Sequence, residues 1–218
     1  MRLSVIIPTL NEEENIEAIL HALGDCLRES DEVVIADAGS NDATVSIAEV
    51  FDCIVLSELQ KGRARQLNAA AKIARGDVLL FLHADTILKK ESVNNLASVL
   101  ERHPKVIGGG FYREFDSLSL VLKFTCWVAG LRGKFWRVFL GDQAMFIRKA
   151  AFEKLGRFDE TLPYGEDLDL SIRMRRDGKT RIVGPSVISS ARRFDREGPA
   201  RQTWIDLKLA LQLVFRRT

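Results

Sequence analysis

Residues 3–23 read LSVIIPTLNEEENIEAILHAL, and this stretch predicts the fold. The run from Leu3 to Ile7 is short, apolar and β-branched, which is typical of a strand buried on both faces in a parallel sheet. Asn11 has the character of a helix cap, and the three glutamates after it favour the positive end of a helix dipole. Apolar residues then recur at helical spacing. The stretch therefore predicts a strand, a turn and a helix in succession.

The same alternation continues through the first half of the chain. Further strands are expected at 33–36, 54–56 and 77–82, and an alanine-rich helix at 64–74. Such alternation predicts an α/β fold with an open, largely parallel, Rossmann-like central sheet flanked by helices. A sheet of this kind binds ligands at the carboxyl ends of its strands.

The second half is less regular. We expect a strand to start at 108–112, a flat amphipathic helix pair at 118–136 and a strand at 144–147. Two further helices are expected at 150–155 and 167–176. No low-complexity linker interrupts the chain, and 218 residues with 46% hydrophobic composition suffice for one core. We therefore expect a single domain over 1–218.

Charge and cysteine content exclude several classes of protein. Lysine and arginine number 32 against 30 acidic residues, and a net charge of +2 indicates no nucleic-acid partner. The three cysteines lack CxxC spacing, which argues against a zinc site and a disulfide framework and favours a reducing compartment. The first apolar run stops at Pro8, too early for a signal peptide or a membrane span. A cytoplasmic location is the expectation.

Polar turns follow three of the expected strands, at 11–12, 37–42 and 83–85. Because parallel strands present their carboxyl ends at one edge, these side chains should converge there. We expect Asp37 to contact a ligand, and Asp42 to cap the following helix.

Asp85 is the candidate metal ligand. A Mg²⁺ or Mn²⁺ ion that bridges phosphates takes one or two protein carboxylates and completes its shell with phosphate and water, so one aspartate suffices. His83 is either a second ligand, better suited to Mn²⁺, or a hydrogen-bond donor to phosphate or ribose. We favour the donor role.

Two further clusters carry charge. Glu166, Asp167 and Asp169 stand at a helix start, where dipole stabilisation explains Asp169 and one of the other two carboxylates suffices as general base. Arg192 and Arg193 form either a diphosphate-binding pair or a solvated basic turn.

Four segments together resemble the inverting GT-A glycosyltransferases of family 2: SVIIPTLNEEENI (4–16), ADAGSNDAT (36–44), the stretch 62–68 before GDVLLFLHAD (76–85), and GRFDETLPYGEDLDLSIRMRRDG (156–178). Their order and spacing are more specific than any one motif, and the resemblance runs from about Leu3 to about Phe194. It implies a GT-A fold whose half 1–110 binds a nucleotide-sugar and whose half 111–218 binds the acceptor and supplies the base.

The resemblance also implies roles for individual residues. The residues of the nucleoside pocket would be Pro8, Thr9, Glu12 and Asp37, with Arg63 near the nucleotide base. The phosphates would lie near His83, Arg192 and Arg193. Asp85 would hold Mg²⁺ or Mn²⁺ on the donor diphosphate, Asp167 of the Glu166–Asp167 pair would be the catalytic base, and Gln143 and Trp136 would contact the acceptor. The implied reaction is a single displacement at the anomeric carbon with inversion.

The chain departs from the family pattern at two places. It has His83-Ala84-Asp85 where the family usually has Asp-x-Asp, and Asp37-Ala38 where it often has two aspartates. Because the first departure removes one aspartate, it leaves the strength of metal binding open. It also keeps an alternative function open, that of an inactive sugar-nucleotide-binding or scaffold protein. The second departure leaves open which nucleotide base the donor carries. A nucleotidyltransferase is disfavoured because no glycine-rich loop follows the first strand.

The stretch 118–139 is rich in large apolar side chains but is interrupted by four cations, so it does not predict a membrane span. It forms either core or a homodimer surface, which we favour, or an interfacial surface at the inner face of a membrane that admits a lipid-linked or hydrophobic acceptor. The C-terminal stretch 204–217 has a similar composition.

Overall fold

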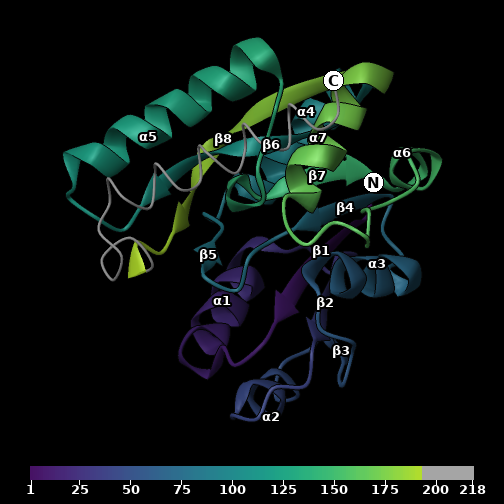
Figure 1. Ribbon diagram of the computed structural model, residues 1–218, viewed down its shortest axis with the longest axis vertical. Helices are drawn as coiled ribbons and strands as arrows, with labels where there is room; N and C mark the ends of the chain where they lie inside the picture. Colours follow the sequence, from purple (N-terminus) through teal and green to yellow (C-terminus); the bar gives the residue numbers. More distant parts are fainter. Residues whose placement is uncertain (193–218) are drawn as a thin grey trace.

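A computed structural model describes residues 1–192 and shows one eight-stranded sheet with helices on both faces (Figure 1). The strands are β1 (Leu3–Thr9), β2 (Glu32–Asp37), β3 (Ile54–Leu56), β4 (Val78–Phe81), β5 (Thr86–Ile87), β6 (Val106–Phe115), β7 (Met145–Arg148) and β8 (Lys179–Ser189). The α-helices are α1 (Glu13–Cys26), α2 (Thr44–Ala48), α3 (Arg63–Ile73), α4 (Ser92–Arg102), α5 (Leu120–Leu131), α6 (Lys149–Lys154) and α7 (Glu166–Asp177). A π-helical turn η1 (Arg132–Trp136) and a 3₁₀ turn η2 (Gly141–Gln143) complete the set.

The first half of the sheet is parallel, as expected from the sequence. Its strands stand in the order β3-β2-β1-β4, and β1 is buried along almost its whole length. Burial on both faces explains why these strands are continuous apolar runs. The carboxyl ends of β1, β2 and β4 therefore meet at one edge.

The second half of the sheet is mixed, so the expectation of a largely parallel sheet describes the first half best. β7 is antiparallel to both β4 and β6, and β8 is parallel to β6. The three glycines 108–110 lie in β6, and a Cβ on Gly109 would come within 1.8 Å of the Arg181 carbonyl oxygen. Glycine at this point lets β6 and β8 approach closely.

Two apolar layers hold the helices against the sheet. On one face, Ile16 and Leu20 of α1 and Leu96 of α4 pack in the same cluster as the strands. On the other face, Leu67 of α3 and Leu170 of α7 do so, together with α6. Figure 1 shows α1 and α3 on opposite sides of β1 and β2. The open sheet with flanking helices is thus confirmed.

Two local expectations differ from the structure. Asn11 is not a helix cap: its φ is +55°, its side chain accepts a hydrogen bond from the Asn41 amide, and α1 begins two residues later. The segment 118–136 is not a helix pair, because α5 runs directly into η1. Asp42 does serve two helix starts, since its carboxylate accepts from the Glu13 and Thr44 amides. Within residues 1–192, no helix has the length and apolar character needed to cross a bilayer.

Candidate active site

A pocket of about 180 Å³ opens at the carboxyl ends of β1 and β4. Most of the donor-site residues expected from the first half of the chain meet there, because adjacent parallel strands end at the same level. Its walls are Pro8, Thr9, Leu10, Glu12, Arg63, Gln66, His83, Ala84 and Asp85.

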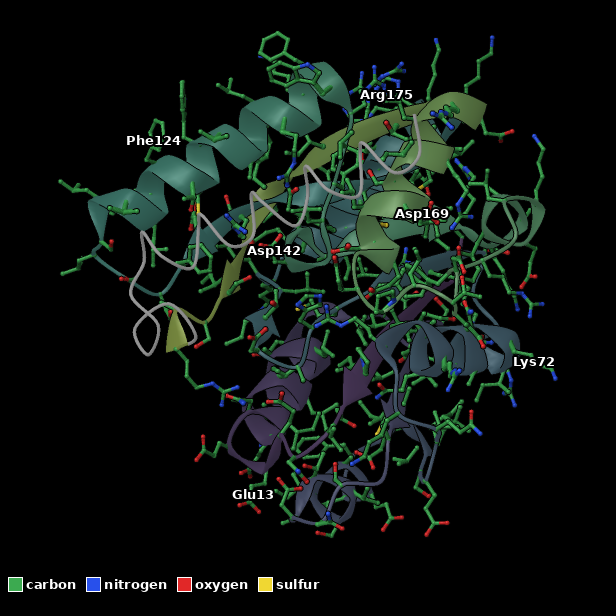
Figure 2. The ribbon with its side chains drawn as sticks, viewed as in Figure 1. Glu13, Lys72, Phe124, Asp142, Asp169 and Arg175 are labelled. Atoms are coloured by element: carbon green, nitrogen blue, oxygen red, sulfur yellow. The ribbon has the colours of Figure 1, made fainter. Side chains whose placement is uncertain are left out.

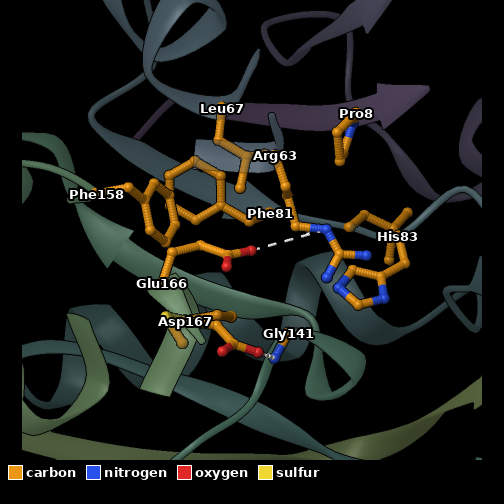
Figure 3. A pocket seen from close by; sticks show the side chains of 11 residues that line it. Pro8, Arg63, Leu67, Phe81, His83, Gly141, Phe158, Glu166 and Asp167 are labelled. Atoms are coloured by element: carbon orange, nitrogen blue, oxygen red, sulfur yellow. Dashed lines mark hydrogen bonds and ion pairs between the residues drawn. The ribbon is translucent and has the colours of Figure 1, made fainter. Parts of the chain in front are cut away.

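A second, narrow pocket of about 10 Å³ adjoins the first and shares Pro8, Arg63 and His83 with it (Figure 3). Glu166 and Asp167 line it from the start of α7. Its volume matches about one water molecule or one hydroxyl group. The structure therefore brings the metal-ligand candidate and the base candidate to two pockets that share three lining residues.

Glu166 is buried, with 6% of its surface exposed, and faces the Arg63 guanidinium at 3.8 Å. Burial raises the pKa of Glu166, the adjacent Asp167 raises it further, and Arg63 opposes both effects. An acid in such an environment holds its proton more tightly than one in water.

Asp167 is held by the backbone of η2. Its Oδ2 accepts a hydrogen bond of 2.6 Å from the Gly141 amide, which orients the carboxylate in the narrow pocket (Figure 3). A Cβ on Gly141 would lie 2.4 Å from the His83 ring and 3.1 Å from Asp167. Only glycine lets η2, His83 and Asp167 come this close.

Asp169 points away from this chemistry. It is 3% exposed and forms a 2.7 Å ion pair with Arg173, which also donates to the carbonyl groups of Leu155 and Arg157. Asp169 therefore holds Arg173, which ties α7 to the loop after α6, and this adds a specific partner to the dipole role expected from the sequence.

The surroundings of His83 favour its neutral form. Burial lowers the pKa of its imidazole well below the usual value, and the Arg63 cation lowers it further. A neutral imidazole offers one N–H donor and one acceptor nitrogen. This state is compatible with the donor role that we favoured.

Asp37 is fully buried at the end of β2. Its two oxygens accept from the amides of Gly39 and Ser40 and from the hydroxyls of Thr9 and Ser40. Asp37 thus shapes the turn beside the pocket from within, and its direct contact with a nucleoside stays a prediction.

Arg192 contacts Glu12, which lines the wider pocket. The guanidinium is within 3.4 Å of the carboxylates of Glu12 and Glu14, so the start of α1 already neutralises part of its charge. Arg193 lies outside the residues that the structure describes.

The two expected acceptor residues lie in different environments. Gln143 is fully buried, accepts from Arg132 at 2.7 Å and donates to the Phe111 carbonyl, so its side chain is engaged within the protein, and its contact with an acceptor stays a prediction. Its side chain is used to fix η2. Trp136 is 58% exposed on η1, and its contact with an acceptor stays a prediction.

Three residues that position the site were not predicted from the sequence. Gln66 donates to the carbonyls of Thr9 and Ala36 and so joins the ends of β1 and β2, while Gly141 holds Asp167. Burial lowers the pKa of Arg132 to about 10, with Arg113 acting in the same direction and Asp167 against it. No local pattern marks these residues, because their partners are distant in sequence.

The metal-ligand chemistry at Asp85 fits a shared site rather than a protein cage. Among residues 1–192, no three His, Cys, Asp or Glu side chains are grouped to hold an ion. Asp85 lines the wider pocket with one carboxylate, and Mg²⁺ or Mn²⁺ on a diphosphate needs no more from the protein.

Known proteins are similar to this chain in sequence. Poly(ribitol-phosphate) beta-N-acetylglucosaminyltransferase TarS of Staphylococcus aureus is 32% identical over 111 residues, which cover 47% of this chain and 19% of TarS. An N-acetylglucosaminyltransferase of Azorhizobium caulinodans is 27% identical over 97% of this chain and 62% of its own length. The chain thus spans less than two thirds of these relatives.

Solved structures agree in fold. TarS 1-349 of S. aureus in complex with UDP-GlcNAc superposes with a TM-score of 0.71 at 22% identity, covering 87% of this chain and 58% of that one. Mannosyltransferase PcManGT from Pyrobaculum calidifontis, in complex with GDP-Man and Mn²⁺, also gives 0.71, at 23% identity over 86% of this chain and 56% of that one. Because the family model for glycosyl transferase family 2 matches residues 4–156, more than half of the chain, this protein belongs to that family.

Proposed function

We propose that this protein transfers a sugar from a nucleoside-diphosphate sugar to an acceptor hydroxyl, with inversion at the anomeric carbon. The observation that carries the proposal is the pair of pockets with shared walls, one lined by Asp85 and the other by Asp167. A donor diphosphate beside Asp85 would place its sugar towards Asp167 across the shared residues Pro8, Arg63 and His83.

Asp167 is the general base of the proposed reaction. Its carboxylate takes the proton of the acceptor hydroxyl while that oxygen attacks the anomeric carbon, and the bond between this carbon and the diphosphate oxygen breaks. One displacement without a covalent intermediate inverts the configuration. The Gly141 amide keeps the carboxylate oriented during the attack.

The leaving diphosphate needs positive charge and hydrogen-bond donors around it. Arg63 lies in both pockets, and neutral His83 offers an N–H beside it. Asp85 would hold Mg²⁺ or Mn²⁺, whose charge when bound neutralises the departing diphosphate.

One structural neighbour is a complex with UDP-GlcNAc and another with GDP-Man and Mn²⁺, so similar folds accept different bases and sugars. The proposal is therefore limited to the class of nucleoside-diphosphate sugars.

The test is calorimetry with uridine, guanosine, adenosine and thymidine diphosphates, with and without Mn²⁺. We expect one of them to bind more tightly with the metal, and Asp85→Ala to lose this enhancement. Asp52→Ala is the matched control, because Asp52 is exposed and precedes β3 at the opposite edge of the sheet. Unchanged Mn²⁺ enhancement in Asp85→Ala would refute the assignment.

Transfer is tested separately with the matching sugar nucleotide. Release of the diphosphate in the presence of an acceptor, with the anomeric configuration of the product read by NMR, reports both activity and stereochemistry. Donor binding without turnover on any acceptor would favour an inactive binding protein instead, and retained configuration would exclude the single displacement.

A further inference from the structure

The helix α5 and the turn η1 expose an unusual concentration of apolar side chains. The α5–η1 face consists of Leu118, Leu120, Phe124, Trp127, Phe135 and Trp136, which are 58–89% exposed. Two aromatic pairs lie within it, Phe124 with Trp127 and Phe135 with Trp136. With Val121 and Val128, this short segment carries eight of the fifteen exposed large hydrophobic side chains found among residues 1–192. Such clustering marks a binding surface rather than scattered surface residues.

The opposite side of α5 explains why this face points outward. Leu122 is fully buried and Ala129 is 3% exposed, so the helix already has an inner stripe that packs towards β6. Figure 2 shows Phe124 projecting from α5 away from the sheet. The apolar side chains of the outer face are therefore additional to the core.

The charges around the face have one sign. Lys123, Lys134 and Arg137 are exposed, and the sequence contains no acidic residue between Asp116 and Asp142. No ion pair within residues 1–192 involves any of these three cations. Lys134 instead lies over the Phe135 ring at 5.6 Å.

We propose that the α5–η1 face binds the surface of an anionic lipid bilayer. Tryptophan and phenylalanine enter the boundary between headgroups and acyl chains, while lysine and arginine beside them contact acidic headgroups. A second copy of the chain is a poorer occupant, because a two-fold contact would bring the same cations against each other. The charge pattern thus selects a lipid surface.

The face is linked to the site through η1 and η2. Arg132, the first residue of η1, donates to the Gln143 side chain in η2, and Gly141 of the same turn holds Asp167. Lipid binding would therefore place the membrane near the element that orients the base. Binding to vesicles is measurable without any turnover, so its outcome is independent of the proposed reaction.

Sedimentation of the full chain with vesicles tests the proposal. We expect the protein to pellet with phosphatidylcholine vesicles that contain phosphatidylglycerol, weakly with phosphatidylcholine alone, and less at high salt. Phe124→Ser combined with Trp127→Ser should lower the partition coefficient by about tenfold or more, because both side chains are exposed and leave the core intact. Val50→Ser, which changes another exposed apolar residue, should have no effect.

Charge reversal provides a second test of the lipid-binding proposal. Lys123→Glu with Lys134→Glu should weaken binding by about fivefold or more per residue at low salt. Lys72→Glu with Arg75→Glu is the matched control, because Figure 2 places Lys72 on α3 on the other side of the molecule from Phe124. Equal losses in both pairs would mean nonspecific attraction and would overturn the assignment to this face.

A single-tryptophan variant locates the contact. With Trp136→Phe and Trp204→Phe, only Trp127 remains, and vesicles with brominated acyl chains should quench its emission. Three results would overturn the proposal: no pelleting with anionic vesicles at either salt, a dimer that Phe124→Ser with Trp127→Ser converts to a monomer, or a Trp127 already shielded from acrylamide in the lipid-free monomer. The last result would show that the chain itself covers the face.

Discussion

Three carboxylates at the start of α7 illustrate how environment separates identical or similar residues. Glu166 faces Arg63 in a buried position, Asp167 accepts from the Gly141 amide in the pocket, and Asp169 is paired with Arg173. Sequence position alone puts all three at a helix N-terminus. The partner of each carboxylate decides what it can do.

We predict that Asp167→Asn binds donor as the parent does but transfers sugar roughly 10²- to 10⁴-fold more slowly, which is the usual contribution of a general base. Asparagine keeps an oxygen to accept from the Gly141 amide, so the local geometry should persist while the basicity is lost. Calorimetry for binding and initial rates for transfer measure the two effects separately.

Asp169→Asn is the control on the same helix. It weakens the ion pair with Arg173 and should lower the free energy of unfolding by about 1–3 kcal/mol, with turnover per folded molecule unchanged. If Asp169→Asn lost turnover and Asp167→Asn kept it, the base assignment would be wrong.

His83 makes stability depend on pH. Its pKa in the folded protein is lowered well below 6.5, so below about pH 6.5 the unfolded chain binds a proton that the folded chain does not. Stability contributed by the neutral ring is present above that pH and is lost as the pH falls towards the folded pKa. The slope of this loss is at most about 1.4 kcal/mol per pH unit.

We predict that His83→Asn removes this slope. Urea unfolding from about pH 7 to about pH 5 should show a smaller fall in stability for His83→Asn than for the parent. His21→Asn is the matched control, because the His21 side chain is 70% exposed on α1 and should keep the parent's slope. Parallel curves for the parent and His83→Asn would contradict the prediction.

At the level of elements, the short turn η2 links the narrow pocket to the second half of the sheet. It precedes β7, holds Asp167 through Gly141 and anchors itself through Gln143. A three-residue element has too few internal hydrogen bonds to define its own position, so its side-chain contacts do so.

We predict that Gly141→Ala lowers kcat by about tenfold or more with a small effect on stability, because the added Cβ must displace His83 or Asp167. Gly24→Ala is the control: a Cβ there meets nothing within 4 Å, and alanine in α1 should stabilise the fold by about 0.5–1 kcal/mol. Steady-state kinetics and urea unfolding measure both. Full activity in Gly141→Ala would show that η2 tolerates displacement and does not position the base.

At the scale of the whole molecule, the parallel and mixed halves of the sheet form one continuous surface. β4 pairs with β7, β7 with β6, and β6 with β8, so α7 and its carboxylates are carried to the edge where β1 and β4 end. The site is therefore assembled from both halves of the chain.

We predict that Gly109→Ala destabilises the protein by about 3 kcal/mol or more, because the Cβ would collide with the Arg181 carbonyl and force β6 from β8. Gly130→Ala is the control, since its Cβ would meet Tyr112 at 3.4 Å, an ordinary contact. Thermal unfolding compares the stability of the two variants with that of the parent. A Gly109→Ala protein as stable as the parent would mean that the two strands can separate without cost.

The sequence by itself determined the parallel half of the sheet and most of its ligand edge. Buried β-branched runs, acidic helix starts and polar turns are local signals. They predicted that Thr9, His83 and Asp85 converge, and all three line one pocket. It also predicted that Asp42 serves the start of the following helix, and Asp42 accepts from the amide of Thr44, the first residue of α2.

Only the tertiary structure decided the rest. The antiparallel entry of β7, the burial of Gln143 and the Gly141 contact with Asp167 all join residues that are distant in the chain. Asn11 has a cap-forming side chain, yet its backbone turns to φ +55° because the loops after β1 and β2 bind each other. Hydrogen bonds between distant segments depend on how the whole sheet is assembled, and local propensity carries no information about that assembly.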